Sequence, residues 1–377
     1  MSKLQKLIQE LCPYGVEYKP LGDKDVSIMQ RGTSLTKKDS IEGIYPVISG
    51  GKVPAFYCNQ FNREGETITV AGSGAGAGYV QYWNEPIFVC DAFSIKGIGD
   101  VSTKYLYYCL TNLQEKIYAT KKGGGVPHVH IASIEKFLVP IPPPQVQKEI
   151  IHILDDFTNL AAELQAELQA RKEQYEYYRN KLLTFDKIGG GTQSVTWVKM
   201  SEICKIYTGG EPPKDAIKGN YKDSMHPYPI WGNGKEVYGY ASSYKIDKDA
   251  TVISSIGANA GTVYFRKAYF TPIIRLKVLI PKNDNILSKF LYFYLSTVSL
   301  AVKSSSVPNM NANDVKKLLI PIPSLAEQQR IVSILDKFEA LVNDLTEGLP
   351  AEIAAVQEQY EYYRNKLLSF PRTKISA

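Results

Sequence analysis

Two histidines separated by one residue, His128 and His130, come nearest to a metal-ligand pair in this sequence. Protein zinc sites combine three or four His, Cys or carboxylate ligands around one ion. The chain has only four histidines, and a second copy of the same region carries Asn309 and Asn311 at these places. Amides do not replace imidazoles as zinc ligands, so we predict no metal site.

A glycine-rich stretch, Gly72-Ser-Gly-Ala-Gly-Ala-Gly78, contains the Gly-x-Gly-x-x-Ala spacing of a dinucleotide-binding loop. Such a loop needs a helix directly after it, because the helix N-terminus holds the pyrophosphate. Here the residues that follow, 79–82, have the pattern of a strand, and so do residues 262–265 after the matching turn of the second copy. We therefore predict a turn between strands, with no cofactor bound by this chain.

Catalytic motifs are equally weak. Glu17-Tyr-Lys19 and Asp314-Val-Lys316 match the acidic-x-Lys element of many nucleases, but neither has a counterpart in the other copy. The sequence has no Walker motif, no Asn-Pro-Pro-Tyr-like motif, no Gly-x-Ser-x-Gly and no His-Glu-x-x-His. We predict no catalytic residues in this chain.

Polar loops with basic neighbours suggest another kind of chemistry. The two histidines follow Lys121 and Lys122, and the two asparagines follow Lys303. Hydrogen-bonding side chains beside lysines suit contacts with DNA bases and phosphates, although a solvated loop is the plain alternative. Further candidates lie in corresponding loops of the two copies: Arg31, Lys37, Lys38 and Lys52 in the first, and Lys214, Lys218, Lys222, Asn233 and Lys235 in the second. Each alone could be a solvated charge, and their recurrence favours a DNA-facing surface.

The element that organises the chain is a repeated segment. Glu173-Gln-Tyr-Glu-Tyr-Tyr-Arg-Asn-Lys-Leu-Leu-Thr-Phe185 recurs at 358–370, and twelve of the thirteen residues are identical. The chain is therefore an internal duplication. Each segment closes a predicted long helix, at 145–186 and 324–371. The apolar seam includes Ile150, Leu160 and Leu168 in the first helix and Ile331 and Leu341 in the second. Gly348-Leu349-Pro350 is expected to kink the second helix.

Each long helix follows a region of short strands, turns and helices. We expect the first domain at 1–144, with a short helix at 3–11, and the second at 187–323, with a tail at 372–377. The fold class is α+β, with two mixed domains at the ends of a long antiparallel two-helix coiled coil. The first helix leads from one domain to the other, so the second must run back to bury its seam.

Composition limits the class of protein. The 377 residues suit two domains, and 44% hydrophobic content is that of a globular protein. The five cysteines form no Cys-x-x-Cys pair, no apolar run approaches the length of a membrane span, and the start of the sequence lacks a signal-peptide core. These features predict a cytoplasmic protein with reduced thiols. The net charge of +6 permits an acidic partner without requiring one.

The helical motifs carry a family resemblance. Pro-Ile-Pro-Pro-Pro-Gln-Val-Gln-Lys-Glu-Ile-Ile at 140–151, Pro-Ile-Pro-Ser-Leu-Ala-Glu-Gln-Gln-Arg-Ile-Val at 321–332, Ile-Leu-Asp at 153–155 and 334–336, and the repeated segment resemble the specificity subunit of type I restriction–modification enzymes. The resemblance covers essentially the whole chain. The alternative function is that of a coiled-coil scaffold protein that binds no DNA. The divergence between the two globular regions disfavours this alternative.

The resemblance implies a non-catalytic subunit with two target-recognition domains, each of which reads one half of a bipartite, asymmetric double-stranded DNA sequence. It further implies docking to two modification subunits that methylate adenine with S-adenosylmethionine, and to restriction subunits that use ATP and Mg in the full complex. The expected docking residues are the tyrosines of the repeated segment: Tyr175, Tyr177, Tyr178, Tyr360, Tyr362 and Tyr363. Tyrosines that simply coat the helices are the alternative. The doubled Ala-Glu-Leu-Gln at 162–169 resembles the repeats that tune spacer length in this family.

Overall fold

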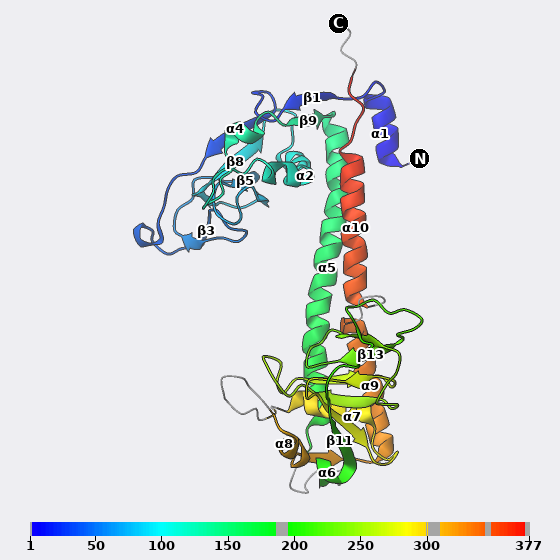
Figure 1. The fold of residues 1–377 in the computed structure, drawn as a ribbon. Coiled ribbons are helices and arrows are strands. Elements are labelled where there is room, and N and C mark those ends of the chain that lie inside the picture. The colour runs from blue at the N-terminus through cyan, green and yellow to red at the C-terminus, as the bar shows by residue number, and fades with distance from the viewer. Residues whose placement is uncertain (1, 186–194, 299, 301–309, 344–347, 374–377) are drawn as a thin grey trace. The chain divides into compact units, whose positions relative to one another are not determined.

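The computed structural model describes residues 2–185, 195–298, 300, 310–343 and 348–373, and the chain divides into two compact units (Figure 1). Unit 1 comprises Met1–Gln165 and Glu352–Ala377, and unit 2 comprises Ala166–Ala351. Both boundaries fall inside helices. Each unit therefore contains a globular region and parts of two long helices.

Unit 1 is built from short strands and helices in the order that the sequence pattern predicts. Its elements are α1 (Lys3–Leu11), β1 (Glu17–Pro20), β2 (Ser27–Arg31), the 3-10 helix η1 (Lys37–Asp39), β3 (Tyr45–Ile48), β4 (Phe56–Cys58), β5 (Thr67–Ala71), β6 (Val80–Trp83), β7 (Phe88–Val89), β8 (Ala92–Gly97), α2 (Thr103–Asn112), α3 (Gln114–Tyr118), α4 (Ile131–Ile134), β9 (Leu138–Ile141) and the first part of α5 (Pro144–Leu183). A capping box between Ser2 and Gln5 begins α1. Helices α2 and α3 follow one another with only Leu113 between them.

Unit 2 repeats this order. Its elements are β10 (Thr196–Lys199), α6 (Met200–Ile203), β11 (Cys204–Thr208), β12 (Ile217–Lys218), β13 (Tyr228–Trp231), β14 (Gly239–Ala241), β15 (Ala250–Ile253), β16 (Val263–Arg266), β17 (Thr271–Pro272), β18 (Lys277–Pro281), α7 (Ser288–Thr297), α8 (Ala312–Lys316), β19 (Leu319–Ile322), α9 (Leu325–Asn343) and the start of α10 (Leu349–Leu367). Most of α10 belongs to unit 1.

The sheets of the two units have matching topology. An antiparallel sheet is ordered β2-β8-β5-β6 in unit 1 and β11-β18-β15-β16 in unit 2. A smaller sheet is ordered β4-β3-β7 and β12-β14-β13-β17, and in both cases its last pair is parallel. Two-stranded pairs, β1 with β9 and β10 with β19, complete each unit. The predicted internal duplication and the mixed α+β class are confirmed.

The core of each unit joins its sheet to its helices. In unit 1 the buried residues Ile68 and Ile95 from the central strands, Leu106 from α2, Ile150 from α5 and Leu368 after α10 belong to one cluster. The corresponding cluster of unit 2 includes Leu279, Leu291, Ile331 and Leu183. Apolar burial of this kind is the main stabilising contribution to a fold, at about 25 cal/mol per Å². The globular region and the helices of one unit therefore share one hydrophobic core.

A buried glutamine fixes the start of a long helix in each unit. The Gln147 amide accepts a hydrogen bond from the Ser102 backbone N–H at 2.9 Å and donates to the Pro142 carbonyl at 2.9 Å. Gln328 makes the same pair of contacts in unit 2, with the Leu287 N–H at 2.9 Å and the Pro323 carbonyl at 3.0 Å. A buried polar group without a partner costs about 1–3 kcal/mol, so these contacts lock the helix to the globular region.

The long helices differ in continuity. Helix α5 has 40 residues, which at 1.5 Å per residue gives a length of about 60 Å. The second helix, expected as one element with a kink, is instead two: α9 ends at Asn343, Gly348 is not helical, and α10 begins at Leu349. Pro350 thus lies in the first turn of α10, where its missing N–H removes no intrahelical bond.

Within each unit the two helices run in opposite directions, as Figure 1 shows for α10 beside α5 in unit 1. In unit 2, Tyr178 of α5 stacks on Phe338 of α9 at 5.9 Å, and Lys172, earlier in α5, lines one cavity with Val342, later in α9. Two expected seam residues are exposed: Leu160 by 43% and Leu341 by 37%. The predicted seam residues Ile150, Leu168 and Ile331 are buried. Leu154 and Leu335, which the spacing did not place in the seam, are buried as well, because the helices also pack against the globular regions.

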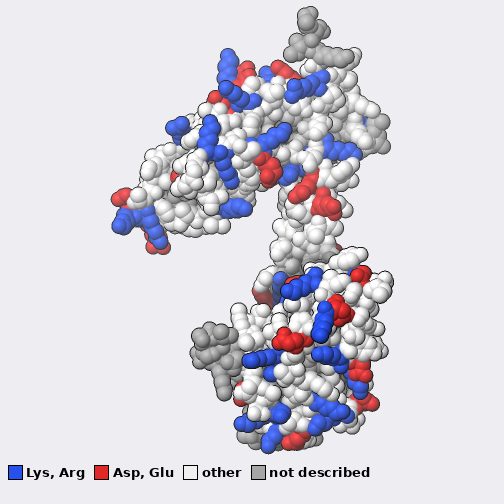
Figure 2. Space-filling view, in the orientation of Figure 1, with Lys and Arg blue, Asp and Glu red and all other residues white. Residues whose placement is uncertain are grey.

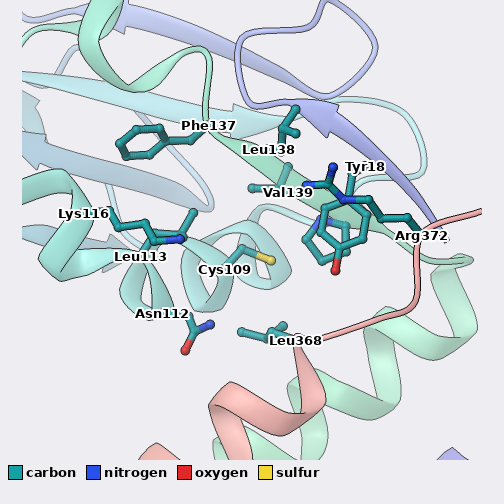
Figure 3. A pocket seen from close by; sticks show the side chains of 11 residues that line it. Tyr18, Cys109, Asn112, Leu113, Lys116, Phe137, Leu138, Val139, Leu368 and Arg372 are labelled. Atoms are coloured by element: carbon teal, nitrogen blue, oxygen red, sulfur yellow. The ribbon is translucent and has the colours of Figure 1, made fainter. Parts of the chain in front are cut away.

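The C-terminal segment packs against β1 within unit 1. The Val16 N–H donates to the Pro371 carbonyl at 2.9 Å, and the Tyr18 hydroxyl donates to the Phe370 carbonyl at 3.0 Å. Beside them lies a cavity of about 260 Å³, into which Cys109 and Leu368 project (Figure 3). Burial raises the pKa of the Cys109 thiol to about 12, so this thiol is not a nucleophile near neutral pH.

Candidate nucleic-acid interface

Three loops of unit 1 meet at one place, and we call them the first loop cluster: residues 49–54 after β3, 72–78 between β5 and β6, and 121–130 between α3 and α4. The Gly74 N–H donates to the Pro127 carbonyl at 3.0 Å, and the Val129 N–H donates to the Gly72 carbonyl at 3.0 Å. A side chain at Gly76 would collide with the Gly50 carbonyl. Glycine is therefore required where the loops touch, and the turn between strands is confirmed.

The lysines of the first loop cluster are exposed or half-buried and lie over tyrosine rings. Lys121 Nζ is 4.1 Å from the centre of the Tyr118 ring, and Lys52 Nζ is 5.1 Å from that of Tyr79. Lys122 and His128 exchange two backbone hydrogen bonds, at 2.8 and 2.9 Å, which closes a short hairpin. The loop cluster thus presents cations on an ordered backbone, as a phosphate-binding surface requires.

The two histidines lie together at the base of this hairpin. Their rings are parallel within 3° and their centroids are 6.0 Å apart. His130 is the residue before α4 and makes no side-chain cap bond. In the part of the chain that the structure describes, no group of three or more His, Cys, Asp or Glu is placed to hold a metal ion.

Three other basic candidates of unit 1 lie elsewhere. Arg31 ends β2, and its carbonyl accepts a hydrogen bond from Arg63 Nη2 at 3.0 Å. Lys37 and Lys38 form η1 together with Asp39. Figure 2 shows basic and acidic side chains intermixed at the tip of unit 1, where Figure 1 draws this deep-blue segment. Mixed charge makes this tip a weaker phosphate surface than the first loop cluster.

Unit 2 has an equivalent second loop cluster, formed by residues 232–237, 254–261 and 310–311. The Met310 N–H donates to the Ser255 carbonyl at 2.9 Å, which joins the last two loops. Asn233 joins the first two: its Oδ1 accepts from the Ser255 N–H at 2.7 Å, and its Nδ2 donates to the Ile274 carbonyl at 2.5 Å. Because these hydrogen bonds already use the Asn233 side chain to join the loops, a structural role is favoured over contact with a DNA base.

Asn311 also has a structural role. It is the N-cap of α8: its Oδ1 accepts hydrogen bonds from the backbone N–H groups of Asn313 at 2.9 Å and Asp314 at 3.0 Å. It occupies the same place before a short helix that His130 occupies in unit 1. Lys303 and Asn309 lie outside the described residues.

The other candidate DNA-binding lysines of unit 2 are exposed: Lys214, Lys218, Lys222 and Lys235. Lys218 Nζ lies 5.6 Å from the Tyr238 ring centre. Asp223 lies close by in the chain, and its contact with His226 at 3.0 Å lowers the pKa of its carboxyl group. The sequence reasoning missed Arg266, whose guanidinium carbon is 3.6 Å from the Trp231 ring centre. No pattern could reveal it, since the matching residue of unit 1 is Trp83.

The repeated tyrosines form the same arrangement twice, and we call each one an aromatic patch. In unit 1, Tyr363 stacks on Phe157 at 5.4 Å and Tyr362 meets Tyr363 edge-on at 5.2 Å. In unit 2, Tyr178 stacks on Phe338 at 5.9 Å and Tyr177 meets Tyr178 edge-on at 5.3 Å. Tyr177 is 60% exposed and Tyr362 is 58% exposed.

Two of the six tyrosines differ from the rest. Tyr175 and Tyr360 are half-buried and pack against the cores of units 2 and 1. Burial raises the pKa of Tyr175 to about 12, and the nearby Glu339 carboxylate adds to the effect. These two side chains belong to the fold, so the outer surface of each aromatic patch is formed by its other two tyrosines.

Comparisons with known proteins agree with this geometry. The family model of the type I restriction modification DNA specificity domain matches the chain twice, over residues 15–173 and 194–355. A type I restriction enzyme specificity subunit of Escherichia coli is 31% identical, with 99% of this chain and 98% of that protein covered. A putative specificity subunit of Haemophilus influenzae is 30% identical, with 94% and 96% covered.

A solved structure shares the fold. The crystal structure of the S subunit of a type I restriction–modification system from M. genitalium superposes with a TM-score of 0.66 at 18% identity, covering 94% of this chain and 96% of that one. None of the helices in the described ranges is long and apolar enough to cross a membrane.

Proposed function

Because the chain belongs to the type I restriction–modification DNA specificity family, we propose that each of its units reads one half of a bipartite, asymmetric DNA target. The observation that carries this proposal is the duplication itself. Both units have a four-stranded sheet of matching order and a second sheet that ends in a parallel pair, but their loop clusters differ in sequence. One scaffold that presents two different loop surfaces suits two different half-sites. A scaffold protein that binds no DNA is not favoured.

The loop clusters supply both kinds of contact that a DNA reader needs. Lys52, Lys121 and Lys122 are suited to phosphates, which give affinity and register but little sequence information. His128 and His130 can donate or accept hydrogen bonds at base edges in the major groove. The glycines at the loop contacts hold these side chains on a compact backbone, which limits the entropy lost on binding.

The aromatic patches suit docking of the modification subunits. Two patches of the same geometry would bind two identical partners. The catalytic steps, and with them S-adenosylmethionine, ATP and Mg, would then belong to the partner subunits, and the complex would act in the cytoplasm. In this proposal the chain binds DNA and positions the methyltransferase, but transfers no methyl group itself.

The isolated chain is expected to neither methylate nor cleave DNA. The reason is the lack of a catalytic or cofactor motif in its sequence. Radiolabelled S-adenosylmethionine, duplex DNA and the pure chain should give no labelled DNA, whereas addition of a modification subunit should give methylated adenine at one bipartite sequence. Methyl transfer by the chain alone would contradict the division of labour, and methylation without sequence preference after addition would contradict the recognition role.

Replacing Lys121 and Lys122 together with Ala is expected to reduce the salt dependence of DNA binding. Each lost phosphate contact lowers the slope of log K against log salt by about 0.9, so the pair should lower it by about 1.8. Binding of duplex DNA measured between about 50 and 200 mM salt reads this slope directly. The matched control is the Lys37→Ala, Lys38→Ala pair beside Asp39, for which we expect a smaller change. An unchanged slope in the Lys121, Lys122 variant would refute the assignment.

A further inference from the structure

A cavity of about 660 Å³ in unit 2 opens between strand β16 and helices α5, α7 and α9. Its charged and aromatic lining comes from separate elements, and includes Lys172, Lys235, Tyr264, Arg266, Lys289 and Glu339. Four of these side chains are cationic and one is acidic. We call this cavity the basic pocket.

The acidic side chain of the basic pocket is already engaged. Glu339 Oε1 accepts a hydrogen bond from the Tyr292 hydroxyl at 2.6 Å. Lys289 of α7 forms an ion pair with Asp336 of α9, with 2.6 Å between Nζ and Oδ1. Lys172 and Lys235 are exposed and face solvent. The carboxylates Glu339, Asp336 and Glu236, which interacts with Arg266, offset three of the four cations, so one positive charge is left in excess.

Arg266 is the unusual member of the basic pocket. Its guanidinium lies against Trp231 at 3.6 Å and Tyr264 at 4.8 Å, measured to the ring centres. Nη2 donates to the Gly234 carbonyl at 3.1 Å and to the Lys235 carbonyl at 3.2 Å, while the buried Nε has no hydrogen-bond partner. Burial lowers the pKa of Arg266 to about 10, so it is charged near neutral pH. The stacked rings and the two carbonyls hold this guanidinium at the wall of the basic pocket.

The basic pocket is particular to unit 2. At the positions of the duplicated sequence that match Lys235 and Lys289, unit 1 also has lysines. At the positions that match Arg266 and Lys172, unit 1 has Trp83 and Gln357. Unit 2 also has two carboxylates, Glu236 and Glu339, where unit 1 has Val53 and Thr158. What distinguishes unit 2 is therefore the presence of Lys172 and Arg266, which the shared scaffold does not need for folding.

We propose that the basic pocket binds one phosphodiester of the DNA backbone, with Lys172 of helix α5 as a contact outside the recognition loops. Guanidinium and ammonium groups are the common protein ligands of phosphate oxygens. Lys235 belongs both to the second loop cluster and to the basic pocket, so a strand that contacts the loops can continue into it. Such a contact fixes the register of the DNA without reading its sequence. This inference rests on the proposed function, since it requires that the chain binds DNA.

The test is a Lys172→Gln substitution in the full chain, which installs the residue that unit 1 carries at the matching position and therefore suits the helix. The control is Lys181→Gln, nine residues further along α5 and thus on the opposite face, since nine residues are about two and a half turns. With duplex DNA as the probe, Lys172→Gln should lower the salt slope by about 0.9 and Lys181→Gln should not change it. Between about 50 and 200 mM salt, the unsubstituted chain should then lose about 3.5 times more affinity than the variant.

The other outcomes overturn the inference. An equal change of slope in both variants would mean general electrostatic attraction. An unchanged slope, with thermal stabilisation of the unsubstituted chain but not of Lys172→Gln by inorganic phosphate, would mean a site for small free anions. Loss of co-purifying modification subunits in a Lys172→Glu variant, with the DNA slope unchanged, would mean an acidic protein partner. If the unsubstituted chain binds no DNA at all, the proposed function itself fails. An unchanged slope in a chain that does bind DNA contradicts only the inference about the basic pocket.

Discussion

Inserting a further Ala-Glu-Leu-Gln after Gln169 is expected to widen the gap in the DNA target by one or two base pairs and to leave both half-sites unchanged. Helix α5 is continuous over 40 residues and includes the doubled tetrapeptide at 162–169. Four residues are close to one turn and add about 6 Å to the helix. One base-pair step is about 3.4 Å. The loop clusters keep their own sequences, so the bases they read should not change.

Methylome sequencing of a host that carries the insertion variant measures both quantities at once. A two-residue insertion at the same place is the control: it adds about 3 Å but turns the rest of the helix by roughly 200°, which moves Tyr175 and Leu183 away from the core of unit 2. That variant should lose methylation instead of changing its target. Altered half-sites with an unchanged gap in the four-residue variant would place specificity in the helices and contradict the proposal.

Replacing Tyr177 and Tyr362 together with Ala is expected to abolish assembly with modification subunits. Both rings are more than half exposed, and each is held edge-on against a second tyrosine that stacks on a phenylalanine of the facing helix. Rigid exposed aromatics of this kind are typical interface hot spots, worth about 2 kcal/mol or more each. That corresponds to about a 30-fold loss of affinity for each partner.

The two single variants make this test more specific. Each should lose one of two partners, so co-purification and sedimentation should show a complex with one modification subunit instead of two. Tyr14→Ala removes an 85% exposed tyrosine outside the aromatic patches and should assemble normally. Tyr175→Ala should lower stability instead, because that ring packs against the core. A double variant of Tyr177 and Tyr362 that assembles like the unsubstituted chain would disprove the docking role.

Some features followed directly from local sequence rules. The duplicated segment implied two copies of every element, and the sheets and the buried glutamines Gln147 and Gln328 repeat in both units. The glycine-rich stretch at 72–78 was predicted as a turn between strands, because a strand pattern follows it, and β6 begins at Val80. These predictions rest on chain periodicity and turn chemistry, which act over a few residues.

The helix seam was predicted in part. Periodicity places Ile150, Leu168 and Ile331 inside, and they are buried, whereas Leu160 and Leu341, also placed inside, are exposed. The spacing of apolar residues predicts a seam correctly only if each long helix packs against the other helix alone. Here each helix also packs against a globular region, which draws Leu154 and Leu335 inward. The break before α10 could be anticipated from Gly348 and Pro350, but not that Pro350 would lie in a first turn.

What the sequence by itself determined about this protein is its duplication, its fold class, its family and the loops that belong to a candidate DNA surface. Only the tertiary structure decided how single side chains are used. Asn233 and Asn311 looked like base readers, and the fold engages them in loop and helix-cap hydrogen bonds. Arg266 gave no signal in the sequence, and the fold places it in a basic pocket with Lys172, which is distant in the chain. The physical reason is that local patterns follow from the backbone, whereas the partners of a side chain depend on long-range packing.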